Sequence, residues 1–284
     1  ISEKACVDME YMAQLTGKSQ DELINELNGV IFLDPVHGEW QTADEYLSGN
    51  VRQKLRTAQR VAARDPFFAG NVDALIAAQP KDLEASEIEV RLGATWFDKK
   101  YIEQFMYETF ETPRYLRGQI EISYVPYTAE WQVSRKSMVR YNDVAAFTTY
   151  GTDRASAYRL LEDALNLRDI RIYDTIEDAD GRERRVLNAK ETTLAAQKQQ
   201  LIRDAFKDWI WKDPERRETL VRQYNEEMNS TRPREYDGSH IVFSGMNPEI
   251  TLREHQKNAI AHVLYGGNTL LAHEVGAGKS ATRS

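Results

Sequence analysis

The chain has 284 residues, of which 41% are hydrophobic and 29% charged, and its formal net charge at pH 7 is −8. This length and composition predict about two domains with real cores, and the acidic balance argues mildly against a dedicated DNA-binding domain, because phosphate contacts need local positive charge. The sequence has no apolar run long enough to cross a membrane, no secretory signal and a single cysteine, Cys6, so we expect a cytoplasmic protein without disulfides or a cysteine zinc site.

The first 40 residues predict two short helices, a strand over residues 30–33, and a turn back to Trp40. Ser19 and Glu22 have the spacing of a capping box, in which each side chain bonds the other residue's amide. Leu23, Ile24 and Leu27 then recur at helical spacing. A helix–turn–helix of this outline can read DNA, and a plain packed scaffold is the more common alternative.

The next predicted helix starts at Thr42, ends at Asp65-Pro66 and is the most basic in the chain. Arginines recur at four-residue steps, which places them on one helix face: Arg52, Arg56, Arg60 and Arg64. Such a stripe can contact phosphates, and a solvated helix face is the alternative. Arg52, Arg56 and Arg60 are therefore candidate DNA contacts.

The middle of the chain predicts alternating helices and hairpins. We expect a helix, a short strand over 88–91 and a helix over 98–110; a hairpin within 119–139; a helix from near Thr152; a charged hairpin around Asp180-Gly181; and helices over 191–211 and 214–228. Further candidate DNA contacts are Arg135, Lys136 and Arg140, close to Trp131 and Tyr141, and Arg182, Arg184 and Arg185 on the second hairpin. Aromatic rings among basic residues can stack on unpaired bases, although core packing is the alternative for most of them.

The segment TLREHQKNAIAHVLYGGNTLLAHEVGAGKS carries the strongest chemical signal in the chain. It predicts a helix that ends at Gly266-Gly267, after a turn-rich linker, and then a short apolar strand over residues 269–272. The loop that follows has the residue types of a phosphate-binding loop: Gly276, Ala277, Gly278, Lys279 and Ser280. Glycines let backbone amides face phosphates, Lys279 would reach the β- and γ-phosphates, and the Ser280 hydroxyl would bind Mg²⁺.

The block LREHQKNAI places Gln256 23 residues before Lys279 and resembles the start of superfamily-two helicases of the Swi/Snf and type III restriction branches. His273 stands where the helicase loop has an aspartate, and Ser280 where it has a threonine. From TYGTDR onward the chain also resembles large helicase-like proteins of phages and conjugative elements, which often carry an adenine-specific DNA methyltransferase region. The resemblance implies that Gln256 recognises adenine, that the loop binds ATP with Mg²⁺, and that the full-length protein is a DNA helicase or translocase.

The expected fold is α+β, predominantly helical with small β-hairpins, followed by the start of a RecA-like α/β motor domain. Residues 1–237 are expected to form an accessory or linker module, with a sub-boundary near 113–150, and residues 238–284 a truncated start of the motor. The acidic motif and arginine finger that complete such an ATP site would lie downstream, and the sequence has no DPPY or NPPY methyltransferase box.

We therefore expect no complete catalytic centre in this chain, and no bound ATP or Mg²⁺ without the rest of the protein. The expected partners are DNA, through the full-length protein, and the downstream helicase lobes in cis, with no membrane. Two alternatives stay open: a protein-interaction module without DNA contact, and a different phosphate-loop NTPase.

Overall fold

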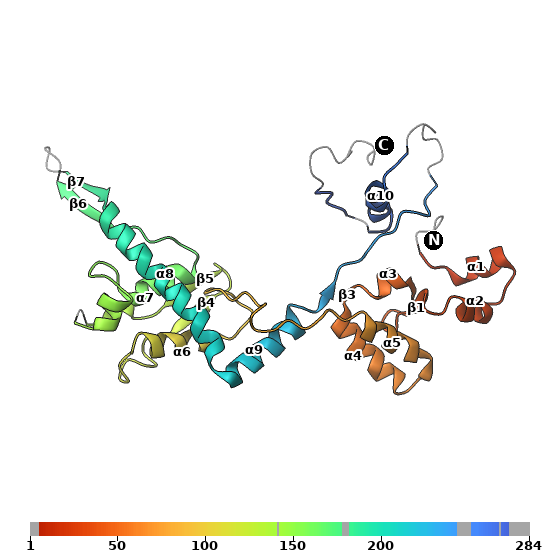
Figure 1. Ribbon diagram of the computed structural model, residues 1–284, viewed down its shortest axis with the longest axis horizontal. Coiled ribbons are helices and arrows are strands. Elements are labelled where there is room, and N and C mark those ends of the chain that lie inside the picture. The colour runs from red at the N-terminus through yellow and green to blue at the C-terminus, as the bar shows by residue number, and fades with distance from the viewer. Residues whose placement is uncertain (1–5, 141, 178–181, 243–250, 267, 273–284) are drawn as a thin grey trace. The chain divides into compact units, whose positions relative to one another are not determined.

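The computed structural model describes residues 6–140, 142–177, 182–242, 251–266 and 268–272 (Figure 1). The chain divides into two compact units: unit 1 comprises Ile1–Lys81 with Asn229–Ser284, and unit 2 comprises Asp82–Met228. The expectation of a mostly helical fold with small hairpins is confirmed. Each sheet formed by the described residues has two antiparallel strands, so the parallel sheet of a RecA-like motor does not occur among them. The predicted functional boundary near residue 237 stays a prediction.

Unit 1 begins with two short helices and a hairpin. These are α1 (Met9–Thr16), α2 (Gln20–Glu26), β1 (Ile31–Leu33) and β2 (Trp40–Thr42). The predicted capping box is present, since the Ser19 hydroxyl accepts from the Glu22 amide and the Glu22 carboxylate accepts from the Ser19 amide at 2.8 Å. Met9, Leu23 and Ile31 form a small core between these elements.

The helix expected from Thr42 to residue 64 is interrupted. It forms as α3 (Ala43–Tyr46) and α4 (Val51–Ala62), with the short strand β3 (Gly49–Asn50) between them. Gly49 has φ +72°, a left-handed conformation that ends helical propagation and favours glycine. The Asn50 side chain then caps α4 by accepting from the Gln53 amide at 2.9 Å. The residue spacing typical of a helix continues across this break, and for this reason the sequence predicted a single helix.

The rest of unit 1 comes from both ends of the chain. After α4 the chain forms η1 (Pro66–Phe68) and α5 (Ala69–Ala77), which packs on α4 around Val51, Ala58 and Leu75. The later segment adds β8 (Thr231–Arg232), which pairs antiparallel with β3, and α10 (Glu254–Gly266). The side-chain amide of Asn229 donates to the carbonyl of Lys81 at 2.8 Å and so joins the two segments of the unit.

Unit 2 is built around one long helix. Its elements are α6 (Lys99–Thr109), β4 (Ile122–Val125), β5 (Glu130–Val133), η2 (Lys136–Met138), η3 (Ala145–Thr149), α7 (Ala157–Leu165), β6 (Tyr173–Glu177), β7 (Glu183–Leu187), α8 (Ala189–Lys212) and α9 (Pro214–Glu227). Figure 1 shows α8 running from the β6–β7 hairpin to the start of α9. The predicted hairpins and the helices over 191–211 and 214–228 are thus confirmed.

Two predictions for unit 2 are wrong in detail. Residues 88–91 form no strand; Ile88 and Val90 are buried, so the alternating pattern reflects burial of an extended segment without a partner strand. The helix expected near Thr152 begins at Ala157 instead. Thr152 bridges to Ala155, and Ser156 is the N-cap that accepts from the Arg159 amide.

The core of unit 2 is rich in aromatic residues. Phe206 of α8 is fully buried and lies 5.1 Å from the ring of Phe105 and 6.1 Å from that of Phe97, measured between ring centroids. Asn225 closes the unit: its side chain accepts from the Leu83 amide at 2.8 Å and donates to the Leu83 carbonyl at 2.9 Å. The two ends of unit 2 are therefore bonded to each other.

Candidate functional site

Gln256 occupies the third position of α10 and is held there by the start of the helix. Its side chain is 7% exposed, and its oxygen accepts from the Arg253 amide at 2.8 Å. This is the glutamine half of a capping box, which satisfies an amide that the helix itself cannot pair. The fold therefore holds the Gln256 side chain in a defined position. According to the helicase resemblance, this side chain would recognise adenine.

The turn-rich segment before α10 lies over that helix; residues 234–240 are called the strap below. The amide of Gly238 donates to the Asn258 side chain at 2.9 Å. A Cβ atom on Gly238 would lie 2.0 Å from the carbonyl oxygen of Lys257, closer than any side chain can come. Glycine is thus required for the close approach of the strap to the helix backbone.

Two ring pairs extend the contact between the strap and α10. The Tyr236 ring stacks on His262 with centroids 4.2 Å apart. Nε2 of His240 lies 3.2 Å from the Tyr265 hydroxyl, and the two rings are nearly parallel. Both rings of the helix are on its last two turns, whereas Gly238 meets the helix one to two turns earlier.

Arg234 links the end of α10 to α3. Its guanidinium lies 3.6 Å from the Glu45 carboxylate, donates to the Tyr265 carbonyl at 3.4 Å and lies over the Tyr236 ring. Its Nε is buried without a hydrogen-bond partner. These contacts are long, so Arg234 spans the junction without making a tight ion pair there.

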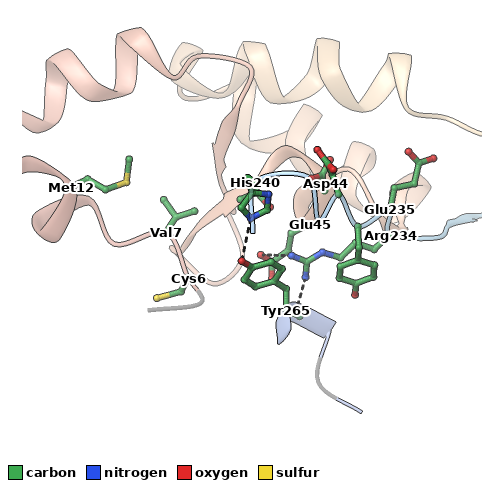
Figure 2. Close-up of a pocket in the computed structure, with 12 residues that line it drawn as sticks. Cys6, Val7, Met12, Asp44, Glu45, Arg234, Glu235, His240 and Tyr265 are labelled. Carbon is green, nitrogen blue, oxygen red and sulfur yellow. Dashed lines mark hydrogen bonds and ion pairs between the residues drawn. The ribbon is translucent and has the colours of Figure 1, made fainter. Parts of the chain in front are cut away.

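A cavity of about 410 Å³ opens beside Arg234 (Figure 2). Figure 2 shows His240 and Tyr265 facing each other across a hydrogen bond, with Arg234 beside them. The lining residues are Cys6, Val7, Met12, Thr42, Asp44, Glu45, Arg234, Glu235, Tyr236, Asp237, His240 and Tyr265. Four carboxylates face one guanidinium, so this cavity repels a polyphosphate and is not the predicted phosphate site.

The predicted phosphate loop lies outside the described residues. Gly276, Ala277, Gly278, Lys279 and Ser280 lie outside the described residues, as does His273. Residues 269–272, expected as the central strand of the motor, are described and form no strand. A parallel strand is stabilised by neighbouring strands, and the described part of the chain offers 269–272 no such neighbour. The assignment of ATP and Mg²⁺ to this loop stays a prediction.

The α4 arginines have a defined setting in unit 1. Arg52 donates from Nε to the Asn229 carbonyl at 3.1 Å. Arg60 donates to the Arg56 carbonyl at 3.3 Å and to the Thr57 hydroxyl at 3.2 Å. Arg56 and Arg60 are exposed, and Arg64 lies beyond the end of the helix. The predicted stripe is therefore present over Arg52, Arg56 and Arg60.

The candidates near η2 differ in their settings. Lys136 forms an ion pair with Glu162, whose second oxygen accepts from the Val133 amide. Arg135 and Arg140 are exposed. Trp131 is 5% exposed and packs on Tyr124, so it is a core residue and cannot stack on a base; Tyr141 lies outside the described residues.

Arg182, Arg184 and Arg185 are exposed on the β6–β7 hairpin but do not form one face. Arg184 pairs with Ile176 and Arg185 with Thr175, so the two guanidinium groups leave opposite faces of the ladder. The Arg185 guanidinium lies 4.9 Å from the Tyr173 ring centroid. The arginines of this hairpin are thus divided between its two sides.

The N-terminal helices carry the opposite charge. Residues 6–42 contain seven carboxylates and a single basic residue other than histidine, Lys18, which pairs with Glu26 at 2.6 Å. Three of the carboxylates, Asp21, Glu22 and Glu26, are on α2, the second helix of the helix–turn–helix outline. This helix would repel DNA phosphates.

Other kinds of site find no support in the described residues. Within them no three His, Cys, Asp or Glu side chains gather to hold a metal ion. None of the helices that the structure describes is long and apolar enough to cross a membrane. Sequence reasoning missed the strap and the cavity beside it, for which Gly238 after Asp237 was the only local signal, and that signal indicates a turn.

Comparisons with known proteins divide the chain much as its two units do. A family model described as "Probable helicase, winged helix domain" matches residues 1–41. A second, described as "Domain of unknown function (DUF8437)", matches residues 91–230. No solved structure matches the chain.

The chain is also similar to a phage protein, "Defense against restriction protein B" of Escherichia phage P1. The two are 24% identical over 293 residues, which is 96% of this chain and 12% of the phage protein. The chain thus spans about an eighth of the length of that relative. The similarity to a probable helicase domain at residues 1–41 and to this phage protein over most of the chain is what the comparisons give.

Proposed function

We propose that the chain is the front part of an ATP-dependent DNA helicase or translocase of the Swi/Snf-like superfamily-two class, and that it is catalytically incomplete by itself. One observation carries the proposal. Gln256 is buried at the start of α10, bonded to the Arg253 amide, and stands 23 residues before the lysine of a GAGKS loop. This pairing of an oriented glutamine with a phosphate loop favours a helicase over another phosphate-loop NTPase.

The proposed roles follow from the chemistry of each side chain. Gln256 recognises adenine, Lys279 neutralises the β- and γ-phosphates, and Ser280 holds Mg²⁺. ATP with Mg²⁺ supplies the free energy of movement. Residues 1–237 position or regulate the motor, and downstream lobes in cis complete the ATP site.

The relatives support the biological setting of the proposal. The winged-helix model is described as part of a probable helicase, and the phage protein is named for defence against restriction. We extend these to the chain as a proposal: the motor processes or protects the DNA of a phage or mobile element, in association with a methyltransferase region. The short share of the phage protein that the chain covers leaves the activity of the whole to experiment.

The test is ATP hydrolysis by a polypeptide that carries this chain together with the downstream helicase motifs. We expect DNA to stimulate hydrolysis and Lys279→Ala to abolish it. Gln256→Ala is expected to reduce the preference for ATP over GTP while DNA stimulation persists. Hydrolysis that is indifferent to DNA would contradict the helicase assignment and favour a different NTPase.

A protein-interaction module without DNA contact is the second candidate. The carboxylates of residues 6–42 favour it, because this segment suits a basic protein surface better than a phosphate backbone. Size-exclusion chromatography with the separate downstream motor, beside a DNA titration, distinguishes the two. Co-elution without any DNA binding would support the interaction module.

A further inference from the structure

We propose that a groove between α2 and α5 in unit 1 is a docking site for a basic segment of a partner protein, which places one large apolar side chain beside Trp40 and Phe67. The site belongs to a part of unit 1 that the proposed motor chemistry does not use. The inference therefore goes beyond the proposed function and holds whether or not the motor hydrolyses ATP.

The groove is a cavity of about 200 Å³ enclosed by two parts of unit 1. One wall comes from α2 and the β1–β2 hairpin, and the other from η1 and the start of α5. The lining residues are Ile24, Asn25, Asn28, Ile31, Phe32, Leu33, Trp40, Phe67, Gly70 and Asn71. The winged-helix model covers the first wall and ends before the second, so the groove requires more of the chain than that domain.

The groove presents aromatic and aliphatic side chains at its rim. Phe67 is 49% exposed and meets Trp40 edge to face, with ring centroids 6.3 Å apart. Ile24 and Trp40 are half-buried, whereas Phe68, which follows Phe67 directly, is buried in the fold. A ring left in water beside an apolar cavity is unfavourable, and a docked apolar side chain removes both surfaces from water.

Three asparagines place hydrogen-bonding groups around this apolar surface. Asn71 is 5% exposed and donates to the Leu33 carbonyl at 3.0 Å, so it fastens one wall to the other. Asn25 and Asn28 are exposed, and the side-chain oxygen of Asn28 lies across the groove from Gly70. An amide side chain can both donate and accept, which suits the backbone of a docked peptide.

The charge around the groove favours a basic partner. Residues 20–42 supply seven of the ten lining residues and contain five carboxylates with no lysine or arginine. Asp21 is exposed one helical turn before Asn25, and Glu39 is exposed directly before Trp40. The lining residues of the second wall are uncharged. Lysine or arginine beside the apolar anchor would meet carboxylates there, whereas a nucleic acid would meet like charge.

Two other surfaces are less suited to a partner of one charge. The cavity beside Arg234 is also acidic, but Arg234 already places a guanidinium among its carboxylates. The β6–β7 hairpin exposes Ile176, Val186 and Leu187, but acidic and basic side chains are mixed along it. The groove between α2 and α5 combines a cavity, an exposed ring and a surrounding charge of one sign.

The experiment is selection of a random peptide library displayed on phage against this chain, followed by anisotropy titrations of the enriched peptides. The test variant is Gly70→Leu, which fills the groove. A Cβ on Gly70 would meet the Asn28 side chain at 3.9 Å, and leucine forms helices better than glycine, so we expect the variant to fold. The matched control is Ala77→Leu, which adds the same side chain at an exposed position of α5 outside the groove. Circular dichroism establishes that each variant is folded.

We expect the enriched peptides to carry one large apolar residue flanked by lysine or arginine. Gly70→Leu should weaken their binding by about tenfold or more, and so should alanine in place of the apolar residue of the peptide. Ala77→Leu should bind the peptides as the unaltered chain does.

A second pair of variants tests the charge at the rim. Asp21→Asn with Glu39→Gln should lower the affinity by about threefold and flatten its dependence on salt, because exposed carboxylates act mainly through screened attraction. The matched control is Glu215→Gln with Glu218→Gln, which removes two exposed carboxylates from α9 of unit 2 and should leave the affinity unchanged.

Four results would overturn the proposal: no enriched peptide whose binding Gly70→Leu weakens, enrichment of acidic or wholly polar peptides, an equal loss in Ala77→Leu, or displacement of the peptides by single-stranded DNA. A dimer of this chain in size-exclusion chromatography that Gly70→Leu dissociates would also overturn it and place a second copy in the groove. None of these measurements uses ATP, so a failure here is distinct from a failure of the proposed motor.

Discussion

The two units of the chain differ in how their cores are built. Unit 2 has one continuous hydrophobic core in which α6, α7 and α8 meet, with Phe105, Phe206 and Ile202 fully buried. Unit 1 has two small separate clusters, around Leu75 and around Leu23, and it is assembled from two distant parts of the chain. Yet Gln256, the strap, the cavity and the α4 arginines are all in unit 1.

The comparison teaches that stability and candidate function are concentrated in different parts of this protein. Elements that bind and move are commonly drawn from the less stable parts of a structure. The family models follow the same division, since the model for residues 91–230 falls almost entirely within unit 2 and the winged-helix model within unit 1. Unit 1 is thus the part to test first for ligands.

The largest expected effect is on the core of unit 2. Phe206→Ala removes a ring that contacts Phe97, Phe105 and Trp209 and leaves a cavity. We expect the free energy of unfolding of unit 2 to fall by ~3–5 kcal/mol. Hydrogen exchange should show the loss in α6 and α8, while the amides of α4 keep their protection.

Leu201→Ala, on the same helix but 43% exposed, is the control and should change stability by less than ~1 kcal/mol. An equal loss of protection in α4 after Phe206→Ala would show that the two units unfold together. The contrast between the cores of the two units would then fail.

An intermediate effect is expected at the strap. Gly238→Ala forces a methyl group against the Lys257 carbonyl, so the strap must move away from α10. We expect a cost of ~1–3 kcal/mol or more in unit 1 and faster exchange of the α10 amides, with unit 2 unchanged.

The matched control for the strap is Gly70→Ala on α5. There the nearest atom to the added methyl group is 3.9 Å away, and alanine stabilises a helix by ~0.5–1 kcal/mol over glycine. If Gly238→Ala is tolerated as well as Gly70→Ala, the strap does not pack on α10 as described.

The smallest effect concerns the turn between β1 and β2, where Nδ1 of His37 lies 2.7 Å from the Asp34 carboxylate. The hydrogen bond and charge of Asp34 raise the pKa of His37 above 6.5. Burial acts to raise the pKa of Asp34, but hydrogen bonds from His37 and the Val36 amide hold it below 3.8.

The sign of each pKa shift defines a window of pH. The raised His37 pKa stabilises the fold below pH 6.5, and this contribution is lost as pH rises through the folded pKa. The lowered Asp34 pKa stabilises it above pH 3.8, and that contribution is lost as pH falls. We expect His37→Asn to flatten the pH dependence of unit 1 unfolding above pH 6.5 and below pH 3.8, where these contributions are lost, and to do so only slightly because His37 is exposed. A steeper dependence in the variant would contradict the pairing.

Local signals in the sequence predicted the elements well. The Ser19–Glu22 capping box, the β6–β7 hairpin and the helix after Asp213-Pro214 form as expected, because each depends on side chains within a few residues of the backbone groups they satisfy. The spacing of Arg52, Arg56 and Arg60 likewise defined their shared helix face. The glutamine of α10 was found from its motif, and its capping bond from the structure alone.

The errors have one physical cause. Residues 88–91 and 269–272 have the composition of strands, but a strand exists only where another strand offers its backbone groups, and that partner is not encoded locally. The turn residues of the strap indicate its path but not the surface it meets. Its contact with α10 depends on Gly238 meeting Lys257, two residues brought together only by the folded chain.

The sequence by itself therefore determined the helix starts, the hairpin turns and the alternation of acidic and basic segments. These features depend on hydrogen bonds and charges between residues that are near neighbours in the chain. The pairing of β3 with β8, the closure of unit 2 by Asn225 on Leu83, and the seating of the strap were decided only by tertiary structure. Each joins residues far apart in sequence, and the local pattern of either segment does not specify the other.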